Sequence, residues 1–137
     1  MSKGRSRIGQ ILNDEKLLKI LGENMRNMSD FTTSFKEVQE RMYQISTDHG
    51  FVESWEKFGE KIALTHSELS EALEYVRKGN GPSDHIPEFL GVEEEFADAV
   101  IRLMSLSQGL GLRLAEAIEA KAAFNAERPY KHGGKAF

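Results

Sequence analysis

Residues 58–76 read FGEKIALTHSELSEALEYV, and both the apolar and the acidic side chains of this stretch recur at helical spacing. Six apolar residues form one stripe along such a helix: Phe58, Ile62, Leu69, Ala72, Leu73 and Val76. Glu68 and Glu71 stand three residues apart, about 120° to one side of the centre of the stripe. The stretch predicts a long helix, from about residue 53 to 78, that has two parallel carboxylates on the shoulder of its buried face.

A second acidic pair follows on the next predicted helix, which spans about residues 92–108. Glu95 and Asp98 are again three apart, and again about 120° from an apolar stripe, in the same rotational sense. That stripe consists of Val92, Phe96, Ala99, Val100 and Leu103. If the two helices pack antiparallel, the two pairs can meet across one groove.

Four carboxylates that face one another repel strongly unless a cation compensates them. Oxygen ligands favour Mg²⁺ or Mn²⁺, or Ca²⁺, over zinc. The spacing therefore predicts a divalent-metal site between the two helices. The alternative is a solvated acidic helix face, since acidic residues at this spacing are common on exposed helices.

The rest of the chain also has helical patterns and no convincing strand. We expect a loose basic arm over residues 1–12, a short helix over 13–27, a helix from Ser29 or Asp30 to His49, and a last helix over 113–127. The predicted fold is all-α, a bundle of four core helices plus an N-terminal helical extension. The predicted organisation is an N-terminal arm and short helix (1–30), a helical domain (31–128) and a basic tail (129–137).

Composition excludes several other classes of protein. The 137 residues fit one domain, and the absence of cysteine excludes disulfides and thiolate metal sites. A formal net charge of -4 argues against a nucleic-acid binder. The sequence has neither a signal peptide nor a run of ~18 apolar residues that could span a membrane. We therefore expect a cytoplasmic protein without a membrane or nucleic-acid partner.

Three segments together resemble a known family. They are HSELSEALE (66–74), EEEFAD (93–98) and KAAFN (121–125) followed by Arg128. This order of motifs is similar to that of the MazG-like all-α pyrophosphohydrolases, over about residues 31–133. The family pattern begins with a glutamate where this chain has Ser67. The two glutamates that are three residues apart in the pattern, Glu68 and Glu71 here, are kept.

The resemblance implies a function for the acidic site. It implies Mg²⁺-dependent hydrolysis of (deoxy)nucleoside triphosphates to the monophosphate and pyrophosphate, as nucleotide-pool house-cleaning. It implies that Glu68, Glu71, Glu95 and Asp98 bind the metal, and Glu71 is our candidate for accepting a proton from water. It also implies assembly into a homodimer or a homotetramer that completes the bundle.

A basic face on the last helix supplies further candidate site residues. Lys121, Asn125 and Arg128 follow at i, i+4 and i+7 and suit phosphate oxygens, and Lys121 is also a candidate catalytic residue. The alternative is a set of cations that favour the C-terminal end of a helix dipole.

Three other residues have two interpretations each. Lys61 contacts phosphate or offsets the carboxylates. Trp55 stacks on the base or anchors the core or an interface. Arg102 is expected to orient Asp98, and the alternative is that it contacts the substrate.

Two other functions stay open at this point. A narrower enzyme would act on dUTP, dCTP or phosphoribosyl-ATP. A non-enzymatic helical interaction module would keep the bundle and use its faces to bind a partner, an idea to which Ser67 lends some support.

Overall fold

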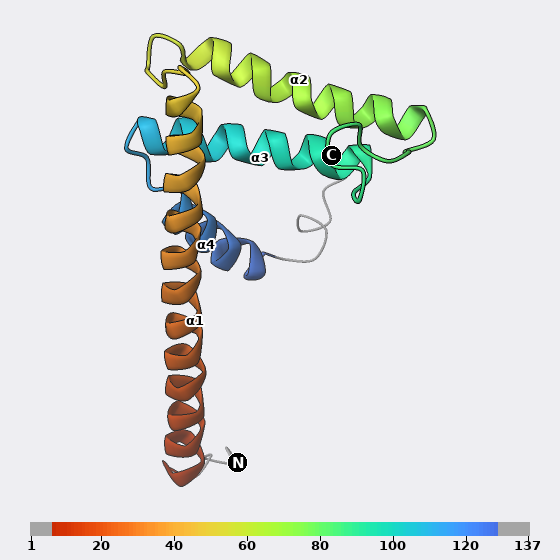
Figure 1. Cartoon of the computed structure of the whole chain (residues 1–137). Coiled ribbons are helices and arrows are strands. Elements are labelled where there is room, and N and C mark those ends of the chain that lie inside the picture. The colour runs from red at the N-terminus through yellow and green to blue at the C-terminus, as the bar shows by residue number, and fades with distance from the viewer. Residues whose placement is uncertain (1–6, 129–137) are drawn as a thin grey trace.

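The computed structural model describes residues 7–128, which form four helices and no strand. These are α1 (Arg7–Asp48), α2 (Phe58–Arg77), α3 (Gly91–Gly109) and α4 (Leu114–Ala126) (Figure 1). The all-α prediction is confirmed. Helices α3 and α4 begin and end within one residue of the positions predicted from the sequence. Helix α2 begins later than predicted, at Phe58, so Trp55 lies in the turn that precedes it.

The expected break between an N-terminal helix and the next helix does not exist. Helix α1 runs for 42 residues without interruption, and its N-terminal part extends beyond the other helices (Figure 1). Ser29 and Asp30, which suggested a cap, lie inside α1. Such residues lower helix propensity by only a few tenths of a kcal/mol each, so without a proline the helix continues. Residues 1–6 of the arm and the basic tail, 129–137, lie outside the described residues.

Helices α2 and α3 form an antiparallel hairpin joined by residues 78–90 (Figure 1). The loop is closed by backbone hydrogen bonds from Gly91 to the carbonyl of Gly81 and from Ser83 to that of Phe89, both at 2.9 Å. The Tyr75 ring lies against Gly91, where a Cβ atom would come within 2.0 Å of the ring. A side chain at position 91 would displace the Tyr75 ring, so glycine allows α2 and the start of α3 to come this close.

The hairpin buries only part of each predicted apolar stripe. In α2 the buried residues are Thr65, Glu68 and Ala72, so Ala72 is the buried member of that stripe, while Leu69, Leu73 and Val76 are about half exposed. The exposed members of the two stripes are Leu69, Leu73 and Val76 on α2 and Phe96, Val100 and Leu103 on α3. Most of them lie one residue after a position that faces the partner helix, and hence about 100° around the helix from it. Because the helices are antiparallel, both stripes lie on the same side of the hairpin.

Helix α1 crosses the hairpin and packs on α3, and α4 packs on α1. Buried residues at the α3 crossing include Met104 and Leu106, and the α4 contact buries Ala115. Polar contacts join α1 to α4, with a 2.7 Å hydrogen bond from Thr32 to Glu119 and an ion pair between Lys36 and Glu116. Over the described part of the chain, no helix has the length and apolar character needed to cross a membrane.

Candidate metal centre

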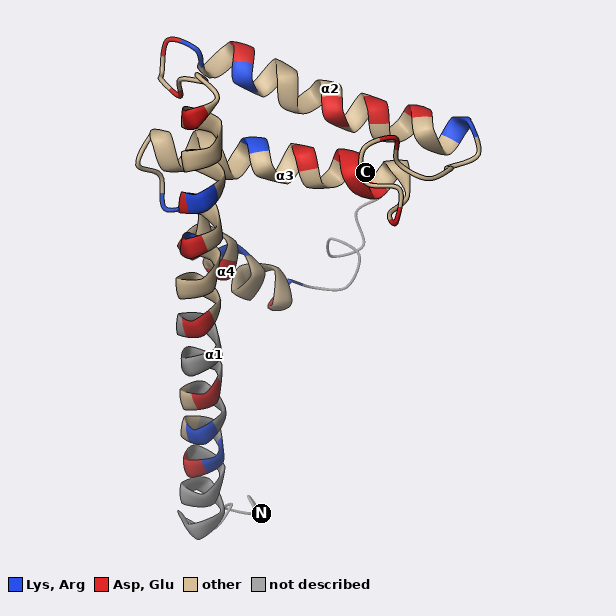
Figure 2. Ribbon diagram, viewed as in Figure 1, with Lys and Arg blue, Asp and Glu red and all other residues tan. Residues whose placement is uncertain are grey.

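Three of the four predicted carboxylates meet between α2 and α3. One side-chain oxygen each from Glu68, Glu71 and Glu95 lies within 4.8 Å of the other two. We call this group the carboxylate trio. Glu68 and Glu95 are only 7% and 6% exposed, while Glu71 lies at the exposed rim. In Figure 2 acidic residues of α2 and of α3 lie along the half of the hairpin that is nearer to the connecting loop. The spacing of three residues on each helix, together with the antiparallel packing, brings these groups together.

Asp98 is close to the trio but not part of it. It lies one turn further along α3, is partly buried, and lines a pocket next to the trio. Burial and the charges of Glu68 and Glu94 raise its pKa, while the charge of Arg102 opposes this rise. Asp98 therefore belongs to the same electrostatic site, although the described side chain does not complete a four-carboxylate cluster.

Glu95 has the most strongly perturbed carboxyl of the site. Burial raises its pKa from 4.5 to about 7, and the charge of Glu71 and a hydrogen bond with Glu68 add to the rise. Desolvation and like charges both disfavour the ionised form. The protonated form of Glu95 is therefore favoured, which relieves part of the repulsion within the trio.

Arg102 forms an ion pair, but not with the carboxylate that we expected. Its Nε donates to Oε1 of Glu68 at 2.6 Å, and its Nη2 lies 2.5 Å from the same oxygen. The guanidinium reaches across from α3 to α2, so its ion pair is with Glu68 rather than with Asp98. Ser67, at the position where the family pattern has a glutamate, donates a 3.3 Å hydrogen bond to Glu71. Both contacts hold carboxylates of the trio in place.

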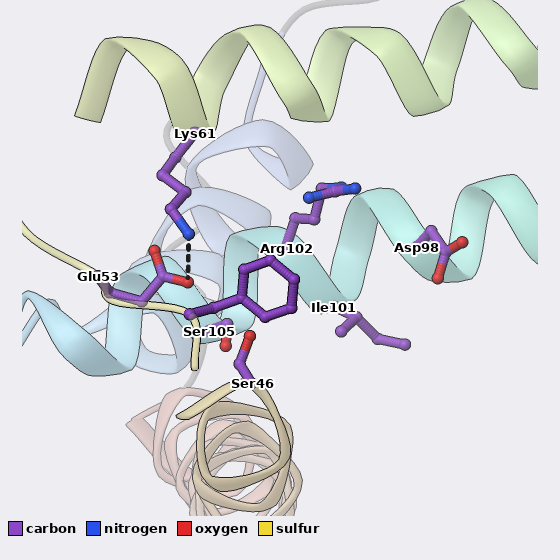
Figure 3. Close-up of a pocket in the computed structure, with 8 residues that line it drawn as sticks. Ser46, Glu53, Lys61, Asp98, Ile101, Arg102 and Ser105 are labelled. Carbon is purple, nitrogen blue, oxygen red and sulfur yellow. Dashed lines mark hydrogen bonds and ion pairs between the residues drawn. The ribbon is translucent and has the colours of Figure 1, made fainter. Parts of the chain in front are cut away.

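A pocket opens beside the trio, toward the N-terminal end of α2 (Figure 3). It is lined by Ser46, Phe51, Glu53, Lys61, Asp98, Ile101, Arg102 and Ser105. Lys61 extends from α2 to Glu53, and their Nζ and Oε1 atoms are 3.2 Å apart. The ion-pair partner of Lys61 is therefore Glu53, and its expected effect on the trio or on phosphate stays a prediction. Glu53 itself was not singled out from the sequence.

The loop between α2 and α3 adds a second group that the sequence did not reveal. Ser83 is only 2% exposed, and its hydroxyl donates a hydrogen bond to Glu94. Nδ1 of His85 lies 2.6 Å from Oε1 of the same glutamate. The hydrogen bond and charge of Glu94 raise the pKa of His85, while the hydrogen bonds from Ser83 and His85 lower that of Glu94. Nine and eleven residues of sequence separate these partners from Glu94, so only the folded loop brings them together.

The other predicted substrate-binding residues lie away from the trio within one chain. Lys121, Asn125 and Arg128 are exposed on or just after α4, which packs on α1, and Lys121 lies over the Phe124 ring at 4.5 Å. The structure therefore does not bring them to the carboxylates, and their role stays a prediction. Trp55 is 62% exposed and stacks on Phe58, with 5.4 Å between ring centroids.

The raised pKa of Glu95 predicts how stability depends on pH in the absence of divalent cations. Since the folded protein holds this proton up to about pH 7 and the unfolded chain loses it near 4.5, folding should weaken as pH rises through this interval. We expect the melting temperature of the native protein, measured in EDTA from pH 5 to 8, to fall relative to that of Glu95→Gln. Identical pH profiles for the two proteins would contradict this reading of the site.

Comparison with known proteins gives no relative. No family model matches the chain, and no curated protein and no solved structure matches it either. A functional interpretation therefore depends on the residues of this chain and on their geometry.

Proposed function

We propose that this protein is a divalent-cation-dependent nucleoside triphosphate pyrophosphohydrolase that acts in nucleotide-pool house-cleaning. The observation that carries the proposal is the meeting of Glu68, Glu71 and Glu95, two of them buried, between antiparallel helices. Arg102 and the Lys61 pocket lie directly beside them. Buried carboxylates that face one another are costly unless a cation compensates them, which favours a cation site. The triphosphate substrate and the bond that is cleaved come from the resemblance of the three segments to the MazG-like pyrophosphohydrolases.

The donor set suits Mg²⁺ or Mn²⁺. An octahedral ion with bonds of ~2.1 Å places its ligand oxygens roughly 3–4 Å apart, and the oxygens of the trio are within 4.8 Å of each other. Small rotations of the side chains close the remaining gap. When bound, the cation would neutralise phosphate charge and lower the pKa of a coordinated water.

The residues of the chain have distinct expected roles around this site. Glu68 and Glu95 are fixed by burial and suit binding of the cation, which requires Glu95 to give up its proton. Glu71 has the exposure needed to accept a proton from water. Arg102 sits where a phosphate oxygen can compete with Glu68 for the guanidinium.

We further propose that a second copy of the chain covers the apolar side of the hairpin. Leu69, Leu73 and Val76 are 48–53% exposed, and the three residues on α3 are 41–55% exposed. A continuous exposed apolar surface of this kind is typical of an interface. Burying the exposed half of each side chain would contribute about 1 kcal/mol per residue. A homodimer, or a pair of dimers, also offers a second α4 whose Lys121, Asn125 and Arg128 are available to a neighbouring site.

The proposal is tested by measuring pyrophosphate release from a panel of triphosphates. The panel contains the four standard dNTPs, dUTP and phosphoribosyl-ATP, each with Mg²⁺, with Mn²⁺ and with EDTA. We expect turnover of at least one compound that EDTA abolishes. The pattern across the panel separates a broad enzyme from a narrow dUTP, dCTP or phosphoribosyl-ATP pyrophosphatase. Folded protein that turns over none of them would rule the proposal out.

The second candidate function is a non-enzymatic helical interaction module, which the exposed apolar side of the hairpin and Ser67 favour. Thermal melting distinguishes it from the enzyme. A cation that binds only the folded chain raises the melting temperature, so an enzyme is stabilised by Mg²⁺ at pH 8 and a module that lacks the cation site is not.

A further inference from the structure

We propose that α1 is a second interface between copies of this chain, at which two α1 helices pair side by side, parallel and in register. This pairing joins two hairpin dimers, each held by the apolar sides of its hairpins, into a tetramer. The pairing does not depend on catalysis, and only the count of four chains rests on the hairpin interface proposed above. The contact surface, which we call the α1 stripe, consists of positions 17, 21, 24, 28, 31, 35, 38, 42 and 45.

The α1 stripe repeats with the spacing of a coiled coil. Its positions alternate by four and three residues, and all of them are apolar in the sequence except Asn24. Every charged residue between positions 15 and 40 stands at one of the three heptad positions outside such a seam and its flanks. These residues are Glu15, Lys16, Lys19, Glu23, Arg26, Asp30, Lys36, Glu37 and Glu40. Two identical stripes can therefore face each other without like-charge repulsion.

The chain itself leaves part of the α1 stripe uncovered. Phe31, Val38 and Ile45 follow one another at intervals of seven residues and are 41%, 37% and 49% exposed. The contacts of α1 within the chain use the neighbouring positions, where Thr32 and Gln39 donate hydrogen bonds to residues of α4 and α3. The N-terminal part of α1 extends beyond the other helices, so a partner helix has access along that part as well (Figure 1).

The one polar position of the α1 stripe determines how the two helices are oriented. In a parallel pair in register, position 24 meets position 24 of the other copy, and two asparagine amides can bond each other. In an antiparallel pair, position 24 meets one of the apolar positions 21, 28, 35 or 42, which offer the amide no partner. The parallel pair is therefore favoured.

The size of the α1 stripe explains why the pairing joins dimers rather than single chains. From position 17 to 45 a helix rises about 42 Å, and a contact about 10 Å wide buries on the order of 800 Å² over both copies. Stable interfaces bury about 1,200 Å² or more, so one pair of helices falls short. Two hairpin dimers make two such pairs at once, which doubles the area and lets each pair support the other. Leu73→Glu, which separates a hairpin dimer, is therefore still expected to leave single chains.

The mass of the protein, from light scattering, tests the pairing. We expect four chains for the native protein and two for Val38→Glu, which places a charge within the stripe while the helix content in circular dichroism stays unchanged. Thr47→Glu adds the same charge to α1 at an exposed position on the side opposite to the stripe, and it should keep four chains. Native protein that is a single chain, or a native mass that Val38→Glu does not change, would overturn the α1 pair.

The two interfaces fail separately in this experiment. A native dimer that Val38→Glu converts into single chains, and Leu73→Glu does not, would support the α1 pair and overturn the hairpin interface. A native dimer that only Leu73→Glu separates would overturn the α1 pair alone. Neither result depends on turnover, so the proposed enzyme activity is decided independently by the release of pyrophosphate.

Disulfide cross-linking tests the orientation and the register, in a chain that has no cysteine of its own. In a parallel pair in register, residue 38 lies across the seam from its equivalent, so Val38→Cys should form an interchain disulfide under mild oxidation. Glu37→Cys, at the exposed neighbouring position outside the stripe, is the control and should stay largely uncross-linked. No disulfide in Val38→Cys, or equal cross-linking of both variants, would overturn the parallel pair, and this mild substitution decides even if Val38→Glu does not fold.

Discussion

Replacing Glu71 with alanine is expected to lower pyrophosphate release at least about 100-fold while the protein stays folded. Substitution of groups that merely support metal ligands costs 10–100-fold, and a direct ligand that also accepts the proton should cost no less. Glu71 is exposed, and alanine is a strong helix former in α2. Since the charge of Glu71 helps to raise the pKa of Glu95, its removal should also bring that pKa closer to 4.5.

Activity and stability are measured together for this variant. The melting temperature in EDTA should match that of the native protein or exceed it, and the stabilisation by Mg²⁺ should be lost. Glu74→Ala is the matched control, because Glu74 lies on the same helix and pairs with Lys78 outside the trio. Full activity in Glu71→Ala, or an equal loss in both variants, would show that the trio is not the reacting site.

Replacing Leu73 with glutamate is expected to convert the assembled protein into monomers. Leu73 is 50% exposed in one chain, so the substitution costs the isolated fold little, but it places a charge in the apolar surface that we propose is buried by a second copy. Light scattering during size-exclusion chromatography gives the mass, and circular dichroism gives the helix content. The native protein should have the mass of a dimer or a tetramer, and Leu73→Glu that of one chain of 15.5 kDa.

The control for this experiment introduces the same charge elsewhere on α2. Ser70 is exposed and lies on the outer side of that helix, so Ser70→Glu should leave the mass unchanged. If the native protein is itself a monomer, or if Leu73→Glu keeps the native mass, the apolar side of the hairpin does not bind a second copy. Measured turnover in the monomeric variant then shows whether the α4 cations act across the interface.

The sequence predicted the parts of this molecule that depend on local spacing. The bounds of α3 and α4 and the approach of Glu68, Glu71 and Glu95 follow from helical periodicity and from the antiparallel hairpin. Periodicity also identified the apolar stripes correctly as sets of residues on one face. It did not show which face a single chain buries, because an apolar stripe can be removed from water either by packing within the chain or by packing against another chain.

Other features depend on contacts that no local pattern encodes. Glu53 becomes part of the site because the turn before α2 folds back on Gly109, and His85 reaches Glu94 because the loop closes on Ser83. Arg102 forms its ion pair with Glu68 on the opposite helix and not with Asp98, which lies on the same helix as Arg102. In each case the partner is determined by tertiary packing.

The most direct test of the central claim is the binding of Mn²⁺, followed by the electron paramagnetic resonance of the free ion at pH 8. The account predicts binding by the native protein that is weaker at pH 6, because Glu95 must release its proton, and at least about tenfold weaker in Glu68→Gln and Glu95→Gln. Native protein that leaves all Mn²⁺ free at pH 8, or variants that bind it as tightly as the native chain, would contradict a metal centre between α2 and α3.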